Sequence, residues 1–154
     1  MDKQMGSHFD DLNRTVEIGN WQYSLSVENQ NTQKQELANS TEYYYIKATL
    51  HMTNIKTKMS LLYSASKNND EYAAMYKYLS FDSKDDLYIK NNDELIYPIG
   101  YVFEPSNGLS KSEKLVYKFQ IDKAQFGKLR NSKNVEFWYI DKLIGLGKIC
   151  FKQQ

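Results

Sequence analysis

The residues that most often carry catalysis or bind metals are few in this chain. It has two histidines, His8 and His51, and one cysteine, Cys150. A zinc site needs three or four His, Cys or carboxylate ligands, so this set predicts no zinc site. His51 falls on the mixed polar face of a predicted strand, and nothing near it in the sequence completes a catalytic constellation. We therefore expect His51 to be a structural or surface residue.

Motifs for phosphate binding and for an activated nucleophile are also missing. The sequence has no Gly-x-Ser-x-Gly elbow, no Walker loop and no dinucleotide fingerprint. The segment Gly145-Leu146-Gly147-Lys148 resembles the end of a phosphate loop, but the earlier glycine and the following Ser or Thr are absent. The favoured interpretation is the start of a strand whose backbone is made flexible by glycine. The sequence thus predicts a protein that is not an enzyme and that binds no cofactor.

One acidic segment could supply oxygen ligands for calcium. Asp82, Asp85 and Asp86 lie close together in the chain, and carboxylates are the ligands that calcium prefers. Lys84 stands inside this segment and the central glycine of an EF-hand is missing, so a solvated hairpin turn is favoured over a calcium site. The 19 acidic residues mark no catalytic pair, and a small carboxylate-dependent hydrolase is the least favoured function.

Tyrosine is the most informative residue type in this chain. There are 13 tyrosines, and aromatic residues favour the half-buried surfaces of sheets. Core packing accounts for each of them singly, but the whole set is too large for one core. Aromatic rings on a sheet face or rim offer large contact area at low entropic cost. We predict a binding patch for a protein or a glycan, made of Tyr43, Tyr45, Tyr97, Tyr101 and Trp138.

Length and charge limit the remaining function classes. A chain of 154 residues is typical of one domain. Its 20 basic and 19 acidic residues give a net charge of +1, without a one-signed field over the whole molecule. This balance excludes the whole protein as a nucleic-acid or membrane-surface binder. No run of apolar residues is long enough for a transmembrane segment.

The dominant hydrophobic period is two, which is typical of strands with one buried face. Alternating or short apolar segments predict strands at 16–18, 21–27, 43–55, 78–81, 87–89, 95–97, 101–103, 115–122, 135–140 and 146–152. One helix is expected at 70–78, capped by Asn68 or Asn69, and 124–129 could form a further helical turn. These elements predict an all-β fold, an immunoglobulin-like antiparallel sandwich of about seven to nine strands with one short helix. A small closed barrel is the alternative.

The chain ends and the single cysteine bear on domain limits and compartment. Residues 1–14 are expected to form a flexible or vector-derived N-terminal segment, and residues 15–154 a single sandwich domain. The first residues contain no apolar core of a signal peptide, which fits a cytoplasmic protein or an exported one whose signal is absent from this chain. Cys150 has no internal partner, so disulfides do not separate these two alternatives.

Several segments resemble telokin-like, immunoglobulin-fold domains of bacterial lipoproteins of the Bacteroidetes type. The long strand Tyr44–Asn54 ends in Thr-Asn, as in that family. Similar segments follow at 79–82, 85–88, 97–98, 115–121 and 137–141. The chain departs from the family pattern at the extra segment 56–76 and at 108–112, where a Pro-Gly pair is expected. The resemblance implies a secreted, membrane-anchored β-sandwich without known catalysis, and it transfers no functional residue.

Together these points predict a non-enzymatic binding or assembly module, the soluble domain of a lipoprotein of the bacterial cell envelope. We expect it in the periplasm or at the cell surface, with a lipid anchor on the native precursor. Its partner is expected to be a protein, with a glycan as the second choice, engaged through exposed aromatics or an open sheet edge. The alternative is a cytoplasmic or mobile-element accessory protein of the same fold.

Overall fold

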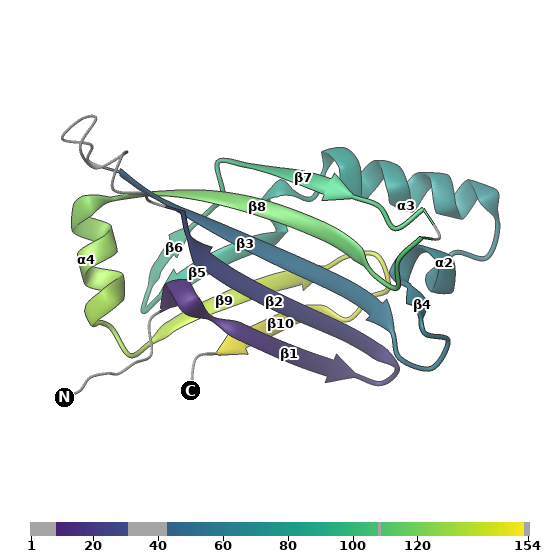
Figure 1. Ribbon diagram of the computed structural model, residues 1–154, viewed down its shortest axis with the longest axis horizontal. Helices are drawn as coiled ribbons and strands as arrows, with labels where there is room; N and C mark the ends of the chain where they lie inside the picture. The colour runs from purple at the N-terminus through teal and green to yellow at the C-terminus, as the bar shows by residue number, and fades with distance from the viewer. Residues whose placement is uncertain (1–8, 31–42, 108, 153–154) are drawn as a thin grey trace.

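Two antiparallel sheets lie face to face in the computed structural model, which describes residues 9–30, 43–107 and 109–152 (Figure 1). The first sheet, sheet A, has the strand order β1-β2-β3-β8-β7, with the short β4 paired to β3. The second, sheet B, has the order β10-β9-β5-β6. The strands are β1 (Asn13–Ile18), β2 (Trp21–Asn29), β3 (Tyr43–Asn54), β4 (Met59–Ser60), β5 (Leu87–Asn91), β6 (Glu94–Ile96), β7 (Gly100–Glu104), β8 (Glu113–Asp122), β9 (Val135–Asp141) and β10 (Gly147–Lys152).

The core lies between the two sheets and follows the predicted alternation. In β3, Ile46, Ala48, Leu50 and Met52 have no exposed surface, while the residues between them face outward. Facing aromatic rings from the two sheets meet in this layer, as Phe119 of β8 and Phe137 of β9 do at 6.1 Å between ring centroids. Tyr23, Tyr117 and Tyr139 are also fully or almost fully buried, so part of the tyrosine excess belongs to the core.

The helices cover the ends and one side of the sandwich. They are α2 (Leu61–Ala65), α3 (Asn69–Phe81) and α4 (Lys123–Asn131), and the short 3-10 turns are η2 (Phe9–Asp11) and η3 (Lys84–Asp86). Figure 1 shows α4 at one end of the sandwich and α2 with β4 at the other. The Asn68 side chain accepts a hydrogen bond from Glu71 N at 2.8 Å, which confirms the predicted cap of α3. The expectation of one short helix is wrong, because residues 9–30, 43–107 and 109–152 alone contain three.

Two local predictions are corrected by the course of α3. Residues 78–81 were expected as a strand, but they form the last turn of this helix. Four residues of alternating polarity fit a helix as well as a strand, and burial of Leu79 in the core favours the helix. The acidic segment after the helix forms the turn η3 instead of a hairpin.

The packed part of the chain starts earlier than the predicted boundary at residue 15. Phe9 is 2% exposed, and its ring lies 5.7 Å from that of Phe126 in α4. Strand β1 begins at Asn13 and turns into β2 at Gly19, whose φ of 60° is a conformation that glycine adopts without strain. Residues 9–14 are therefore part of the fold, and the rest of the predicted flexible segment, 1–8, lies outside the described residues.

Candidate binding surface at the open edge of the sandwich

The two lateral edges of the sandwich differ in how they are covered. On one side, β1 of sheet A lies against β10 of sheet B. There Arg14 Nε donates a hydrogen bond to the backbone oxygen of Lys152 at 2.8 Å, which joins the two sheets. On the other side, β7 and β6 are the last strands of their sheets. Among the described residues, neither of these two strands has a second neighbouring strand. Helix α3 contacts β7 through the rings of Tyr76 and Phe103, 5.3 Å apart, and no strand in the described part of the chain pairs with the free side of β7 or β6, so we call this the open edge.

A strip of exposed apolar side chains follows the open edge. Leu95, Tyr97, Ile99 and Val102 are 45%, 46%, 51% and 59% exposed, respectively. The chain crosses here from sheet B to sheet A, because β6 ends at Ile96 and β7 begins at Gly100. We call these four residues the open-edge strip. Leu95 and Tyr97 lie on the side of sheet B and Val102 on the side of sheet A, so the strip crosses the edge from one sheet to the other. Exposed large apolar side chains along one edge are typical of an interaction site.

An aromatic row on the outer face of sheet B continues the strip. The Tyr97 ring lies 5.6 Å from the ring of Tyr88 in β5. Tyr88 pairs in register with Trp138 of β9, and Trp138 pairs with Cys150 of β10. Trp138 Nε1 donates a hydrogen bond to Glu136 Oε1 at 3.1 Å. Burial among these neighbours raises the pKa of Tyr88, so its hydroxyl stays neutral and able to donate a hydrogen bond.

On the side of sheet A, the strip borders a shallow hollow of about 440 Å³. Ile99 and Val102 form part of its wall together with Val116 of β8 and the stems of Lys47 and Lys118. The Lys118 ammonium lies 4.7 Å from the centre of the Tyr45 ring, and Lys47 Nζ lies 3.5 Å from Glu28 Oε1. An apolar wall with a cationic rim can hold a side chain of a bound protein segment.

The structure brings together only part of the predicted aromatic patch. Tyr97 and Trp138 share the outer face of sheet B, whereas Tyr43 and Tyr45 alternate outward on β3 of sheet A. Tyr101 is half-buried: its ring stacks on Tyr117 at 5.4 Å, and its hydroxyl accepts a hydrogen bond from Ser83 N at 2.9 Å. The five predicted residues therefore do not form one surface. Sequence reasoning missed Tyr88, because its place between Tyr97 and Trp138 depends on strand order.

The acidic segment considered for calcium is engaged by the protein itself. Asp86 is 1% exposed, and its carboxylate accepts hydrogen bonds from the hydroxyls of Tyr78 and Ser83. Lys142 Nζ lies 3.0 Å from the other Asp86 oxygen, and Asp85 pairs with Lys84 at 2.9 Å. Over the described ranges, no group of three or more His, Cys, Asp or Glu residues could hold a metal ion.

The Asp86 cluster instead ties α3 to both sheets near the open edge. Ser83 Oγ lies 3.1 Å from Tyr117 Oη, and Tyr117 Oη donates a hydrogen bond to Ser83 O at 3.0 Å. Burial, and then the bond to Asp86, raises the pKa of Tyr78 well above its ordinary value. Burial also raises the pKa of Tyr117. Both hydroxyls therefore stay protonated and act as hydrogen-bond donors within the fold.

His51 and Cys150, the two reactive residue types in the described part of the chain, lie on opposite sheets. His51 faces outward from β3, with Nδ1 3.2 Å from Ser112 Oγ. Burial and the nearby Lys114 lower the pKa of His51 below its usual value. Burial and Glu136 raise the pKa of Cys150 to about 11, so its thiol is protonated at neutral pH.

The glycine segment that resembles a phosphate loop is a turn whose backbone amides bond to the carboxylate of Asp141. The buried Asp141 accepts hydrogen bonds from the backbone nitrogens of Leu143, Ile144 and Leu146, the last at 2.7 Å. Gly145 and Gly147 have φ of 78° and 73°, which suit glycine. The Asp141 carboxylate therefore already accepts the backbone N–H groups that a bound phosphate would need.

In comparison with known proteins, no family model, no curated protein and no solved structure matches the chain. Over the described residues, the structure has no helix with the length and apolarity needed to cross a membrane.

Proposed function

We propose that this protein is a non-enzymatic binding or assembly module that takes an extended segment of a protein partner at its open edge. The observation that carries the proposal is the open-edge strip beside β7, the last strand of sheet A. An edge strand presents unpaired backbone groups, and a partner strand can pair with them. In such strand addition the backbone bonds supply affinity, and side-chain contacts supply specificity.

The chemistry of the strip favours a protein partner over a glycan. Leu95, Ile99 and Val102 are aliphatic, so they match apolar side chains and offer nothing to sugar hydroxyls. Tyr97 and Trp138 supply aromatic contact area next to them, and such residues are enriched where binding energy concentrates. A glycan stacking on these two rings is the second outcome that the test below separates.

The resemblance to telokin-like domains extends the proposal to fold family and place. We propose an immunoglobulin-like module of a bacterial cell-envelope lipoprotein, in the periplasm or at the cell surface. Two antiparallel sheets packed face to face support this family without distinguishing it from other sandwiches. Fractionation of source cells and the mass of the mature protein test it. A membrane-associated species heavier by lipid is expected, and an unmodified protein in the cytosol would contradict it.

Site-directed photocrosslinking tests the binding mode. A benzophenone amino acid replaces Val102 on the open edge or, as the matched control, Thr15, an exposed residue of β1 on the closed edge. After irradiation of intact source cells, we expect a protein adduct of defined mass at position 102 and none at position 15. Addition of Ile99→Lys should remove the adduct. Adducts of equal yield at both positions, or none at 102, would overturn the proposal, and an adduct sensitive to glycosidases would identify a glycan.

A further inference from the structure

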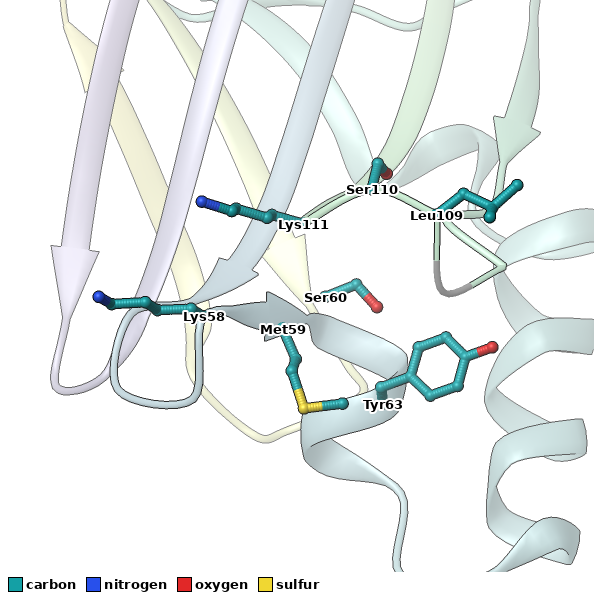
Figure 2. A pocket seen from close by; sticks show the side chains of 7 residues that line it. All are labelled: Lys58, Met59, Ser60, Tyr63, Leu109, Ser110 and Lys111. Atoms are coloured by element: carbon teal, nitrogen blue, oxygen red, sulfur yellow. The ribbon is translucent and has the colours of Figure 1, made fainter.

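Two loops at one end of the sandwich expose apolar and basic side chains together. They are residues 55–58 between β3 and β4, and residues 109–112 before β8 (Figure 1). Leu109 is 91% exposed, and Met59 and Ile55 are 45% and 38% exposed. A pocket of about 310 Å³ lies between the two loops. Figure 2 shows Lys58 and Lys111 extending to one side of this pocket, and Leu109 with Tyr63 on the other.

The charges carried by these two loops are of one sign. Residues 55–59 and 109–112 include Lys56, Lys58 and Lys111 and contain no Asp or Glu. None of the three lysines has an acidic partner within the described part of the chain. The acid that follows in sequence, Glu113, is fully buried. The net charge of +1 for the whole chain therefore conceals a local cationic surface.

The buried Glu113 joins the segments that follow and precede the two loops. Its carboxylate accepts hydrogen bonds from Ser106 N at 2.8 Å and from Leu62 N, at the start of α2, at 2.9 Å. Ser106 Oγ donates to Ser60 Oγ at 3.0 Å, and Leu109 N donates to Ser106 O at 2.8 Å. Backbone groups bonded inside the loop need fewer partners from water when the loop enters an apolar phase.

We propose that this end of the protein docks on a bilayer surface that contains anionic lipids. Leu109 and Met59 enter the interface between headgroups and acyl chains, while Lys56, Lys58 and Lys111 contact the lipid phosphates. Apolar residues provide the buried area, and each lysine adds attraction to the negative surface. The lysines match the negative charge of such a bilayer, and Leu109, at 91% exposed, has apolar surface available for insertion. This inference does not depend on the proposed function of the open edge.

Cosedimentation of the full chain with vesicles tests the proposal. We expect binding to mixed phosphatidylglycerol–phosphatidylcholine vesicles, little binding to phosphatidylcholine alone, and loss of binding at high salt. Leu109→Ser should weaken binding about tenfold, since the side chain no longer buries apolar surface. Lys58→Gln and Lys111→Gln should each weaken it about fivefold.

Two matched controls make the result specific to this surface. Phe81→Ser removes another strongly exposed apolar side chain, 75% exposed at the end of α3, and should leave vesicle binding unchanged. The pair Lys123→Gln and Lys128→Gln on α4, at the opposite end of the sandwich, should also have no effect (Figure 1). Absence of vesicle binding, equal binding to both vesicle types, or equal losses in the controls would overturn the proposal. Competition by soluble glycerol phosphate at the same site would instead indicate a small-anion pocket.

Discussion

The two lateral edges of this sandwich differ in how the backbone groups of their end strands are protected. At the closed edge, β1 lies against β10 and Arg14 bonds to the backbone of Lys152, while its outward residues, Asn13, Thr15 and Glu17, are polar. At the open edge, Val102 and Ile99 are more than half exposed beside an end strand. Natural sheets protect their edges with charge or cover. The unprotected edge is therefore the one to which we assign binding.

The largest expected effect on stability comes from breaking the support of the open edge. Asp86→Ala removes the acceptor shared by Tyr78, Ser83 and Lys142 and leaves buried hydroxyls without it. We expect a loss of about 2–3 kcal/mol in the free energy of unfolding, below the cost for a fully buried ion pair because the Lys142 side chain is 55% exposed.

Chemical denaturation measures this loss, and hydrogen exchange locates it. Exchange should accelerate in β7, whose Tyr101 bonds to Ser83, more than in β1. Lys84→Ala serves as the control, since its ion pair with Asp85 lies at the surface. Equal stability of the Asp86→Ala variant and the parent would contradict the role of this cluster.

Charges on the open-edge strip should abolish binding while leaving the fold intact. The double variant Ile99→Lys/Val102→Lys places two ammonium groups where we expect apolar contact, so affinity for the crosslinked partner should fall at least about tenfold. Both residues are more than half exposed, and the melting temperature should change little.

The mirror variant Thr15→Lys on the closed edge provides the comparison, and binding should be unaffected by it. Titration calorimetry with the purified partner measures both variants. An equal loss for both would show that the effect comes from charge in general and would remove the difference between the edges.

A smaller effect is expected when the cover of the closed edge is removed. Arg14→Ala deletes the hydrogen bond to Lys152 O and should cost about 1 kcal/mol of unfolding free energy. Arg14→Lys should recover little, because the bond uses Nε of the guanidinium. Urea unfolding of the three proteins measures this. A cost near zero would mean that β1 is held to β10 by packing alone.

The smallest effect is the pH dependence from His51, on the outer face between the two edges. Its pKa in the folded protein is lowered by burial and by Lys114, so the unfolded chain binds the proton more readily. Stability from this residue is present above its ordinary pKa and is lost as the pH falls through the folded value. His51→Gln should flatten this part of the profile of stability against pH. An unchanged slope below neutral pH would contradict it.

The alternation of side chains predicted the long strands well, but it could not predict which strands are neighbours in each sheet. Strands β2, β3, β8 and β9 and the Asn68 cap follow from local pattern and are confirmed. The neighbours Tyr88 and Trp138 are fifty residues apart and meet only through the order of strands in sheet B. Glu113 looks like an ordinary surface acid in the sequence, yet its carboxylate is buried and accepts hydrogen bonds from Ser106 N, seven residues before it, and from the distant Leu62 N.

The difference between edges also depends on topology. No sequence feature marks β7 as a final strand or β1 as covered, since both are short and lie beside turns. The exposure of Leu95 has a weak signal in hindsight, because it alternates in β6 with the inward residue Ile96, whereas Tyr97 and Ile99 lie in the connection after that strand. Period-two reasoning predicts two faces of a strand, and it does not say which one another sheet will cover.

Hydrogen exchange of β7 with and without a bound partner segment tests the central claim most directly. The probe is the peptide identified from the adduct at position 102, added to the full chain. If the partner adds a strand at the open edge, amides of β7 should exchange at least about tenfold more slowly, while those of β1 keep their rates. Unchanged exchange in β7, or protection confined to the outer face of sheet B, would contradict strand addition at this edge.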